Sequence, residues 1–167
     1  MHDRLFFYIC SELLAYPDSS LILSLPRLRK EAESLPRQKA TALISFIDYM
    51  SSSDPIELQE TYVRTFDFSE ECSLYLSYSS FGVSMERGSE LINLRSLYKR
   101  SGLIEDTKEL PDYLPTFLKF LSVADSDVEV AIERYLKAIV IMAENVEKSK
   151  SPYSQLFRIL ADTIGGI

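Results

Sequence analysis

Apolar residues along this chain recur at steps of three and four positions, which is the period of an α-helix that buries one face. Strand-like alternation of apolar and polar residues is scarce. The first helical pattern covers residues 3–15 and ends before Pro17, because the residue that precedes a proline avoids the helical conformation. We therefore predict that residues 1–167 form a single all-α domain, a bundle of about seven to nine helices.

Residues 20–34 contain Pro26 in what would otherwise be one helix. Because an interior proline costs a helix about 3 kcal/mol, we expect a turn followed by a helix that restarts at Pro26. Residues 69–82 have no clear period and are expected to form a loop. The apolar spacing predicts the remaining helices over residues 37–50, 55–67, 85–101, 113–123, 127–148 and 152–164.

Three of these helices have recognisable start signals. Residues 54–57 (DPIE) resemble a capping box with a proline in the first turn, and Ser126 with Glu129 resembles a second capping box. Pro115 can lack its N–H at no cost only within the first turn of a helix. Asp112 is therefore the expected N-cap of the helix that contains Pro115.

The composition is that of an ordinary globular protein, with 46% hydrophobic and 26% charged residues. Its pI near 4.8 argues against binding to nucleic acid, whose phosphates require clustered Lys and Arg. Cys10 and Cys72 are the only two cysteines and lie far apart in the sequence, which is neither a disulfide framework nor a metal-ligand spacing, so both are expected to be reduced. The apolar runs at 5–10 and 138–143 are too short for a signal peptide or a membrane span. We therefore expect a cytoplasmic protein without membrane insertion.

The residue types that catalysis needs are missing. A nucleophilic hydrolase or transferase requires a base beside its nucleophile, yet the only histidine is His2, close to a terminus. The acidic pairs Glu70–Glu71 and Glu105–Asp106 stand in polar segments and are expected to be solvated. The chain has no phosphate-binding loop, dinucleotide fingerprint or Cys/His metal cluster. We expect neither catalysis nor a cofactor.

Acidic residues are concentrated in one part of the chain. Between Asp54 and Asp112 there are twelve Asp and Glu and six Lys and Arg, a net charge of −6 out of the whole chain's −7. Two segments of this region, YVRTFD at 62–67 and ELPDYLP at 109–115, combine aromatic, acidic and proline residues more densely than packing requires. A focused negative field favours a cationic partner, so this region is predicted to be a recognition surface.

These segments resemble those of the NarJ family, the nitrate reductase delta-subunit branch of the TorD-like molybdoenzyme assembly chaperones. The similarity covers residues 5–121 and rests on LLAYPD, LQETYVRTFD, CSLYLS, the Arg87-Gly88 pair and ELPDYLP. It implies a TorD-like helical monomer, with helix exchange into a dimer as an alternative. It also implies a binder that recognises the arginine-bearing N-terminal peptide of a nitrate reductase-like catalytic subunit. Such a binder holds that subunit for molybdenum cofactor insertion before membrane attachment or export.

The resemblance and the chemistry of arginine together define a candidate site. Arginine forms bidentate hydrogen bonds with carboxylates and stacks on aromatic rings. We assign Asp67, Glu109 and Asp112 to the charged contacts. The resemblance places the peptide groove near Tyr62, Phe66 and Asp67 and near the segment Pro111, Asp112 and Tyr113, and the apolar floor is assigned to Tyr62, Phe66, Tyr75, Tyr113 and Leu114.

Each of these assignments has a structural alternative. Asp112 could serve only as an N-cap, and Tyr62 and Phe66 lie on a helix stripe that could simply face the core. Arg87 and Gly88 are interpreted as structural. Arg87 is expected to pair with a nearby carboxylate, and Gly88 is expected to let another helix approach closely.

Two other classes of function stay open. The chain could be an acidic helical scaffold or regulatory module that binds a folded partner protein, or an enzyme acting on small molecules. A peptide-binding chaperone should bind a free N-terminal peptide with an affinity that falls as salt rises. A scaffold should ignore that peptide, and an enzyme should show turnover.

Overall fold

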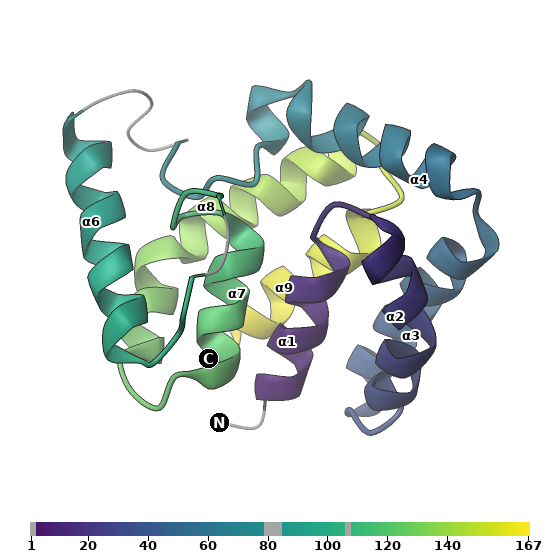
Figure 1. Ribbon diagram of the computed structural model, residues 1–167, viewed down its shortest axis with the longest axis horizontal. Coiled ribbons are helices and arrows are strands. Elements are labelled where there is room, and N and C mark those ends of the chain that lie inside the picture. The colour runs from purple at the N-terminus through teal and green to yellow at the C-terminus, as the bar shows by residue number, and fades with distance from the viewer. Residues whose placement is uncertain (1–2, 79–84, 106–107) are drawn as a thin grey trace.

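Helices make up the regular structure of the residues that this computed structural model describes, 3–78, 85–105 and 108–167 (Figure 1). The eight α-helices among them agree with the predicted all-α class. His2, Asp106 and the end of the expected 69–82 loop lie outside the described residues. The elements are α1 (Arg4–Leu13), α2 (Ser19–Ala32), α3 (Arg37–Ser52), α4 (Pro55–Tyr62), the π-helical turn η1 (Val63–Asp67), the 3-10 turn η2 (Glu70–Cys72), α6 (Met85–Arg100), α7 (Leu114–Val123), α8 (Val128–Lys148) and α9 (Ser154–Gly165).

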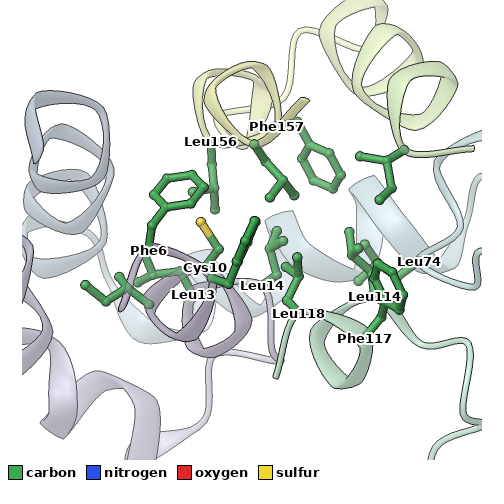
Figure 2. Close-up of a cluster of buried hydrophobic side chains, with 14 of the residues drawn as sticks. Phe6, Cys10, Leu13, Leu14, Leu74, Leu114, Phe117, Leu118, Leu156 and Phe157 are labelled. Atoms are coloured by element: carbon green, nitrogen blue, oxygen red, sulfur yellow. The ribbon is translucent and has the colours of Figure 1, made fainter. Parts of the chain in front are cut away.

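Helix α1 lies at the centre of the packing. It contacts α7 on one side and α2 and α3 on the other, while α8 pairs with α9 and α9 reaches α3. The Arg4 guanidinium fixes the start of α1 to the end of α7 by donating to the Ala124 carbonyl at 2.9 Å. Figure 2 shows the resulting apolar core, in which α1 contributes Phe6, Cys10 and Leu13. Leu14, directly after α1, also lies in this core, together with Leu118 of α7 and Leu156 and Phe157 of α9.

Both cysteines are free and buried. Cys10 is 0% exposed among the apolar side chains of the core, and this burial raises the pKa of its thiol because a thiolate is poorly solvated there. Cys10 therefore behaves as a small apolar core residue.

Two predicted helix boundaries are confirmed. The Asp54 carboxylate accepts hydrogen bonds from the amides of Ile56 and Glu57, at 2.9 and 3.3 Å, and so caps α4. Gly102 follows α6 with a φ of 79°, the left-handed conformation that glycine adopts without a steric penalty.

The predicted restart at Pro26 is wrong, because α2 continues through this residue. The Pro26 ring is exposed, so the carbonyl that loses its helical hydrogen bond lies on the solvent side. On the opposite face, Leu21, Leu25 and Leu28 are buried in the core. Their burial offsets the cost of the proline, since each buried leucine contributes roughly 1.5–3 kcal/mol.

The predicted capping box at Ser126 and Glu129 is also wrong. Asp127 occupies the N-cap position of α8 with a φ of 63°, and no side chain caps that helix. The Ser126 hydroxyl instead donates to the carboxylate of the neighbouring Asp127 at 3.2 Å. The last helix begins at Ser154, two residues beyond the predicted start.

Helix α6 lies at the edge of the molecule (Figure 1) and is held partly by a buried charge. Glu90 is 4% exposed and accepts hydrogen bonds from Arg134 and Tyr135 of α8. A carboxylate that is buried without partners costs several kcal/mol, and the hydrogen bonds from these two donors offset that cost for Glu90. The predicted role of Gly88 is wrong, because it is exposed and no neighbouring helix among the described residues approaches within 4 Å of a Cβ built there.

None of the described helices combines the length and the apolar character that a membrane span needs.

Candidate functional site

Two segments far apart in the sequence pair side by side and form the frame of the site. The Leu76 amide donates to the Asp112 carbonyl at 2.9 Å, and the Leu114 amide donates to the Leu74 carbonyl at 2.8 Å. Between these bonds Tyr75 and Tyr113 form an antiparallel bridge, which sets their ring centroids 5.5 Å apart. The pairing therefore brings together two of the predicted site residues.

Asp112 holds this frame in place, and its predicted role as an N-cap is wrong. Its carboxylate is fully buried and accepts hydrogen bonds from the Ser77 amide at 3.0 Å and the Ser77 hydroxyl at 2.6 Å. Arg87 of α6 donates to the same oxygen at 3.3 Å, which confirms that Arg87 pairs with a carboxylate. Tyr113 occupies the N-cap position of α7 instead, without a side-chain hydrogen bond.

The tyrosine pair is joined to the core through Tyr62. The hydroxyl oxygens of Tyr62 and Tyr113 are 2.7 Å apart, and the Tyr62 hydroxyl also donates to the Leu14 carbonyl at 3.1 Å. The Phe66 ring lies 4.9 Å from the Tyr62 ring, edge to face. Tyr62 and Phe66 are each 4% exposed, so they are packed as core residues and support Tyr113 from behind. Burial raises the pKa of Tyr113 to about 12, which keeps its hydroxyl protonated at neutral pH.

Two carboxylates line the exposed edge beside these rings. Glu109 accepts a hydrogen bond from the Tyr75 hydroxyl. Partial burial and the nearby charge of Glu109 both raise the pKa of Asp67. Partial burial disfavours any charge at Asp67, whereas the part of the shift that comes from Glu109 reflects a negative field, and that field favours a cation. Exposed carboxylates beside tyrosine rings suit a guanidinium group, which can pair with the former and stack on the latter.

Two hollows border the Tyr75–Tyr113 pair, one lined by Tyr113 and the other by Tyr75. The first has a volume of about 230 Å³ and is bounded by Tyr113 together with Glu12 of α1 and Ile104 after α6. The second has a volume of about 320 Å³, and its lining includes Glu70, Glu71, Tyr75, Tyr78, Ile141 and Met142. The contribution of α8 to this second hollow was not predicted. Exposed Ile141 was its only sequence signal, as an apolar residue on the solvent face of α8.

The nine predicted site residues thus divide into two groups. Asp67, Tyr75, Glu109 and Tyr113 reach the surface. The other five lie behind them, and Pro111 is fixed there by the Tyr98 hydroxyl, which donates to its carbonyl at 2.6 Å. These buried residues are Tyr62, Phe66, Pro111, Asp112 and Leu114. Within the described residues, no group of three or more His, Cys, Asp and Glu side chains could hold a metal ion.

Comparison with known proteins identifies relatives of this chain. The family model described as nitrate reductase delta subunit matches residues 32–158. A Bacillus subtilis (strain 168) protein, named a probable nitrate reductase molybdenum cofactor assembly chaperone NarJ, is 35% identical over 163 residues, which are 96% of this chain and 89% of that protein. The nitrate reductase molybdenum cofactor assembly chaperone NarJ of Escherichia coli (strain K12) is 29% identical over 156 residues, which are 91% of this chain and 66% of that protein.

A solved structure shares the fold. The crystal structure of a candidate redox enzyme maturation protein from Archaeoglobus fulgidus matches with a TM-score of 0.73 at 23% sequence identity. The match covers 99% of this chain and 95% of the other. The helical arrangement of Figure 1 therefore also occurs in a protein whose sequence has diverged widely.

Proposed function

Since this chain belongs to the nitrate reductase delta subunit family, we propose that it binds the N-terminal peptide of the catalytic subunit of a nitrate reductase-like molybdoenzyme. In this proposal it holds the subunit for molybdenum cofactor insertion before membrane attachment or export. The coarser role is that of a maturation chaperone and not of an enzyme, as the names of its relatives indicate.

The observation that carries the proposal is the convergence of Asp67, Glu109, Tyr75 and Tyr113 on one exposed edge. An arginine of the peptide can pair with the carboxylates while its plane stacks on a tyrosine ring. The family resemblance implies a peptide that combines arginine with apolar residues. The two hollows that border the tyrosine pair offer apolar surface to the apolar residues of the peptide.

The buried members of the predicted site act indirectly in this proposal. Asp112 is 0% exposed, and Ser77 and Arg87 both donate to its Oδ2, so burial keeps its carboxylate from touching a peptide. Its role is to position Tyr75 against Tyr113. Tyr62 and Phe66 form the support on which Tyr113 rests.

Calorimetry with a synthetic peptide tests the proposal. The probe is the first 30 or so residues of the nitrate reductase catalytic subunit encoded in the same genome, a length sufficient to form a helix. We expect the chain to bind it with a Kd of about 1 μM or tighter, near −8 kcal/mol, and to lose affinity as salt is raised.

Charge reversal at the site sharpens that test. The double variant D67K/E109K should bind the peptide at least tenfold more weakly, because it places two cations where the peptide arginine is proposed to sit. The matched control E133K/E144K makes the same change in net charge on exposed positions of α8 and should bind like the wild type. Equal losses in both variants would mean that only the overall charge matters.

The second candidate function is an acidic scaffold that binds a folded partner. The concentration of negative charge between Asp54 and Asp112 is what favours it. Such a scaffold should ignore the free peptide yet capture the intact catalytic subunit on co-expression, so the two experiments together separate the candidates.

A further inference from the structure

Large apolar side chains are exposed together along α4 and the turn that follows it. Ile56 is 66% exposed, Phe68 is 82% exposed and Tyr16, in the loop between α1 and α2, is 44% exposed. They line a groove of about 560 Å³ together with Gln59, Glu60, Val63 and Arg64, hereafter the α4 groove. Single exposed apolar residues are common on protein surfaces, but several that lie together usually mark an interaction site.

The α4 groove adjoins the acidic edge at two points. The Tyr16 ring packs edge to face on Tyr62 with centroids 5.6 Å apart, and the Tyr62 hydroxyl lies 2.7 Å from that of Tyr113. At the other point Phe68 directly follows Asp67 in the chain. The η1 turn sets this end of the groove, since the Phe68 amide donates to the Val63 carbonyl at 3.2 Å, five residues back.

We propose that the α4 groove receives the apolar residues of the same client peptide whose basic residue meets Asp67 and Glu109. The inference rests on the proposed function and adds a second subsite to it, with a defined chemistry. The occupant is a short helical segment with one apolar face and a basic residue beyond one end of that face.

Dimensions and charge favour this occupant. Ile56 and Phe68 are twelve residues apart along a nearly continuous helical segment, which spans roughly 18 Å, or about three turns of a bound helix. A helix lying in such a groove uses apolar residues at three- and four-residue steps. The surroundings are more acidic than basic, with Glu57, Glu60 and Asp67 against Arg64.

The same charges argue against a second copy of this chain as the occupant. Two copies joined through their α4 grooves would bring two sets of like negative charge together, which opposes association. A basic peptide meets the opposite condition. Charge complementarity therefore selects the peptide over self-association.

The test is peptide calorimetry on the variant I56S/F68S, with the 30-residue client peptide defined above as the probe. Both side chains are largely exposed, so the variant keeps the core, and its circular dichroism melt should match that of the wild type. We expect the Kd to rise at least tenfold, as for the loss of two central apolar anchors. The control L23S/I92S removes two comparably exposed apolar residues, on α2 and α6, and should bind as the wild type does.

A second arm separates this inference from the proposed function. A peptide whose apolar residues are replaced by serine should bind the wild type and I56S/F68S with the same low affinity. The variant D67K/E109K should bind that peptide more weakly still. Unchanged binding by I56S/F68S, alongside loss in D67K/E109K, overturns the groove and leaves the acidic site standing. Failure of the wild type to bind the peptide overturns both proposals. A wild-type dimer in sedimentation that I56S/F68S converts to a monomer assigns the groove to a second copy and overturns the inference.

Discussion

The buried carboxylate of Asp112 accepts two hydrogen bonds from Ser77, one from its backbone amide at 3.0 Å and one from its hydroxyl at 2.6 Å. The residues stand 35 positions apart, so the interaction ties the segment around Tyr75 to the start of α7. Because Tyr75 and Tyr113 line the proposed peptide site, the shape of that site depends on a carboxylate that is itself fully buried.

Removal of this carboxylate should cost more than removal of an ordinary helix cap. We expect Asp112→Ala to lower the free energy of unfolding by about 3 kcal/mol, since it strips partners from a buried amide, a hydroxyl and a half-buried guanidinium. Asp54→Ala removes an exposed N-cap and should cost about 1 kcal/mol. Urea denaturation of both variants measures the difference. Equal losses in the free energy of unfolding would indicate that Asp112 contributes no more than an ordinary helix cap.

Glu90 should anchor α6. We expect Glu90→Ala to destabilise the protein by about 2 kcal/mol, because it leaves the Tyr135 hydroxyl without its buried acceptor. Arg134→Ala should cost about 1 kcal/mol or less, since the Arg134 side chain is 56% exposed. Hydrogen exchange should show faster exchange along α6 in the Glu90 variant. Unchanged exchange there would mean that apolar contacts alone hold the helix.

Asp67 should make stability fall as pH rises. Its folded-state pKa is raised above the ordinary 3.8 by partial burial and by Glu109, so the folded chain holds this proton more tightly than the unfolded chain does. The contribution of Asp67 to the free energy of unfolding is fully present below the unfolded-state pKa and is lost as pH rises through the folded-state pKa. Asp67→Asn should therefore gain stability relative to wild type over that window, and urea titrations from about pH 4 upward would show it. Exposed Asp162→Asn supplies the comparison, and a gap between Asp67→Asn and wild type that stays constant with pH would contradict the expectation.

The tyrosine pair allows the ring and the hydroxyl to be separated. Tyr113→Phe removes the hydrogen bond to Tyr62 while Tyr62 keeps the Leu14 carbonyl as its acceptor. We expect a loss of about 1 kcal/mol in stability and little change in peptide affinity, because the ring is retained. Tyr113→Ala should also weaken peptide binding severalfold. If Tyr113→Phe loses as much affinity as Tyr113→Ala, the hydroxyl rather than the ring contacts the peptide.

Local signals predicted the helices well, and non-local partners explain the misses. The cap at Asp54 and the stop at Gly102 depend on neighbours within a few residues, so their patterns were sufficient. Asp112 looked like a cap for the same local reason. Its partners at Ser77 and Arg87 lie 35 and 25 residues away, and nothing in the adjacent sequence identifies them.

The sequence identified the residues of the candidate site better than it predicted their arrangement in space. Aromatic and acidic residues in YVRTFD and ELPDYLP marked the two segments, and the structure brings Tyr62 and Tyr113 into direct contact. Which of the nine site residues reach the surface and which are buried behind them became clear only from the burial of each side chain in the structure. The α4 groove was missed because Ile56 and Phe68 fall outside the predicted core stripe, where single apolar residues usually have no special meaning.

The packing of α1 against α7 also sets an order of events during synthesis. Arg4 and the Ala124 carbonyl, which meet at the junction of these helices, are separated by 120 residues. On the ribosome, the apolar face of α1 has no partner from α7 until most of the chain has been translated. Contacts between such distant residues slow folding, because a long loop must close before they form. The chain therefore passes through a long nascent stage in which α2 and α3 can already cover one side of α1 while its α7-facing side has no partner.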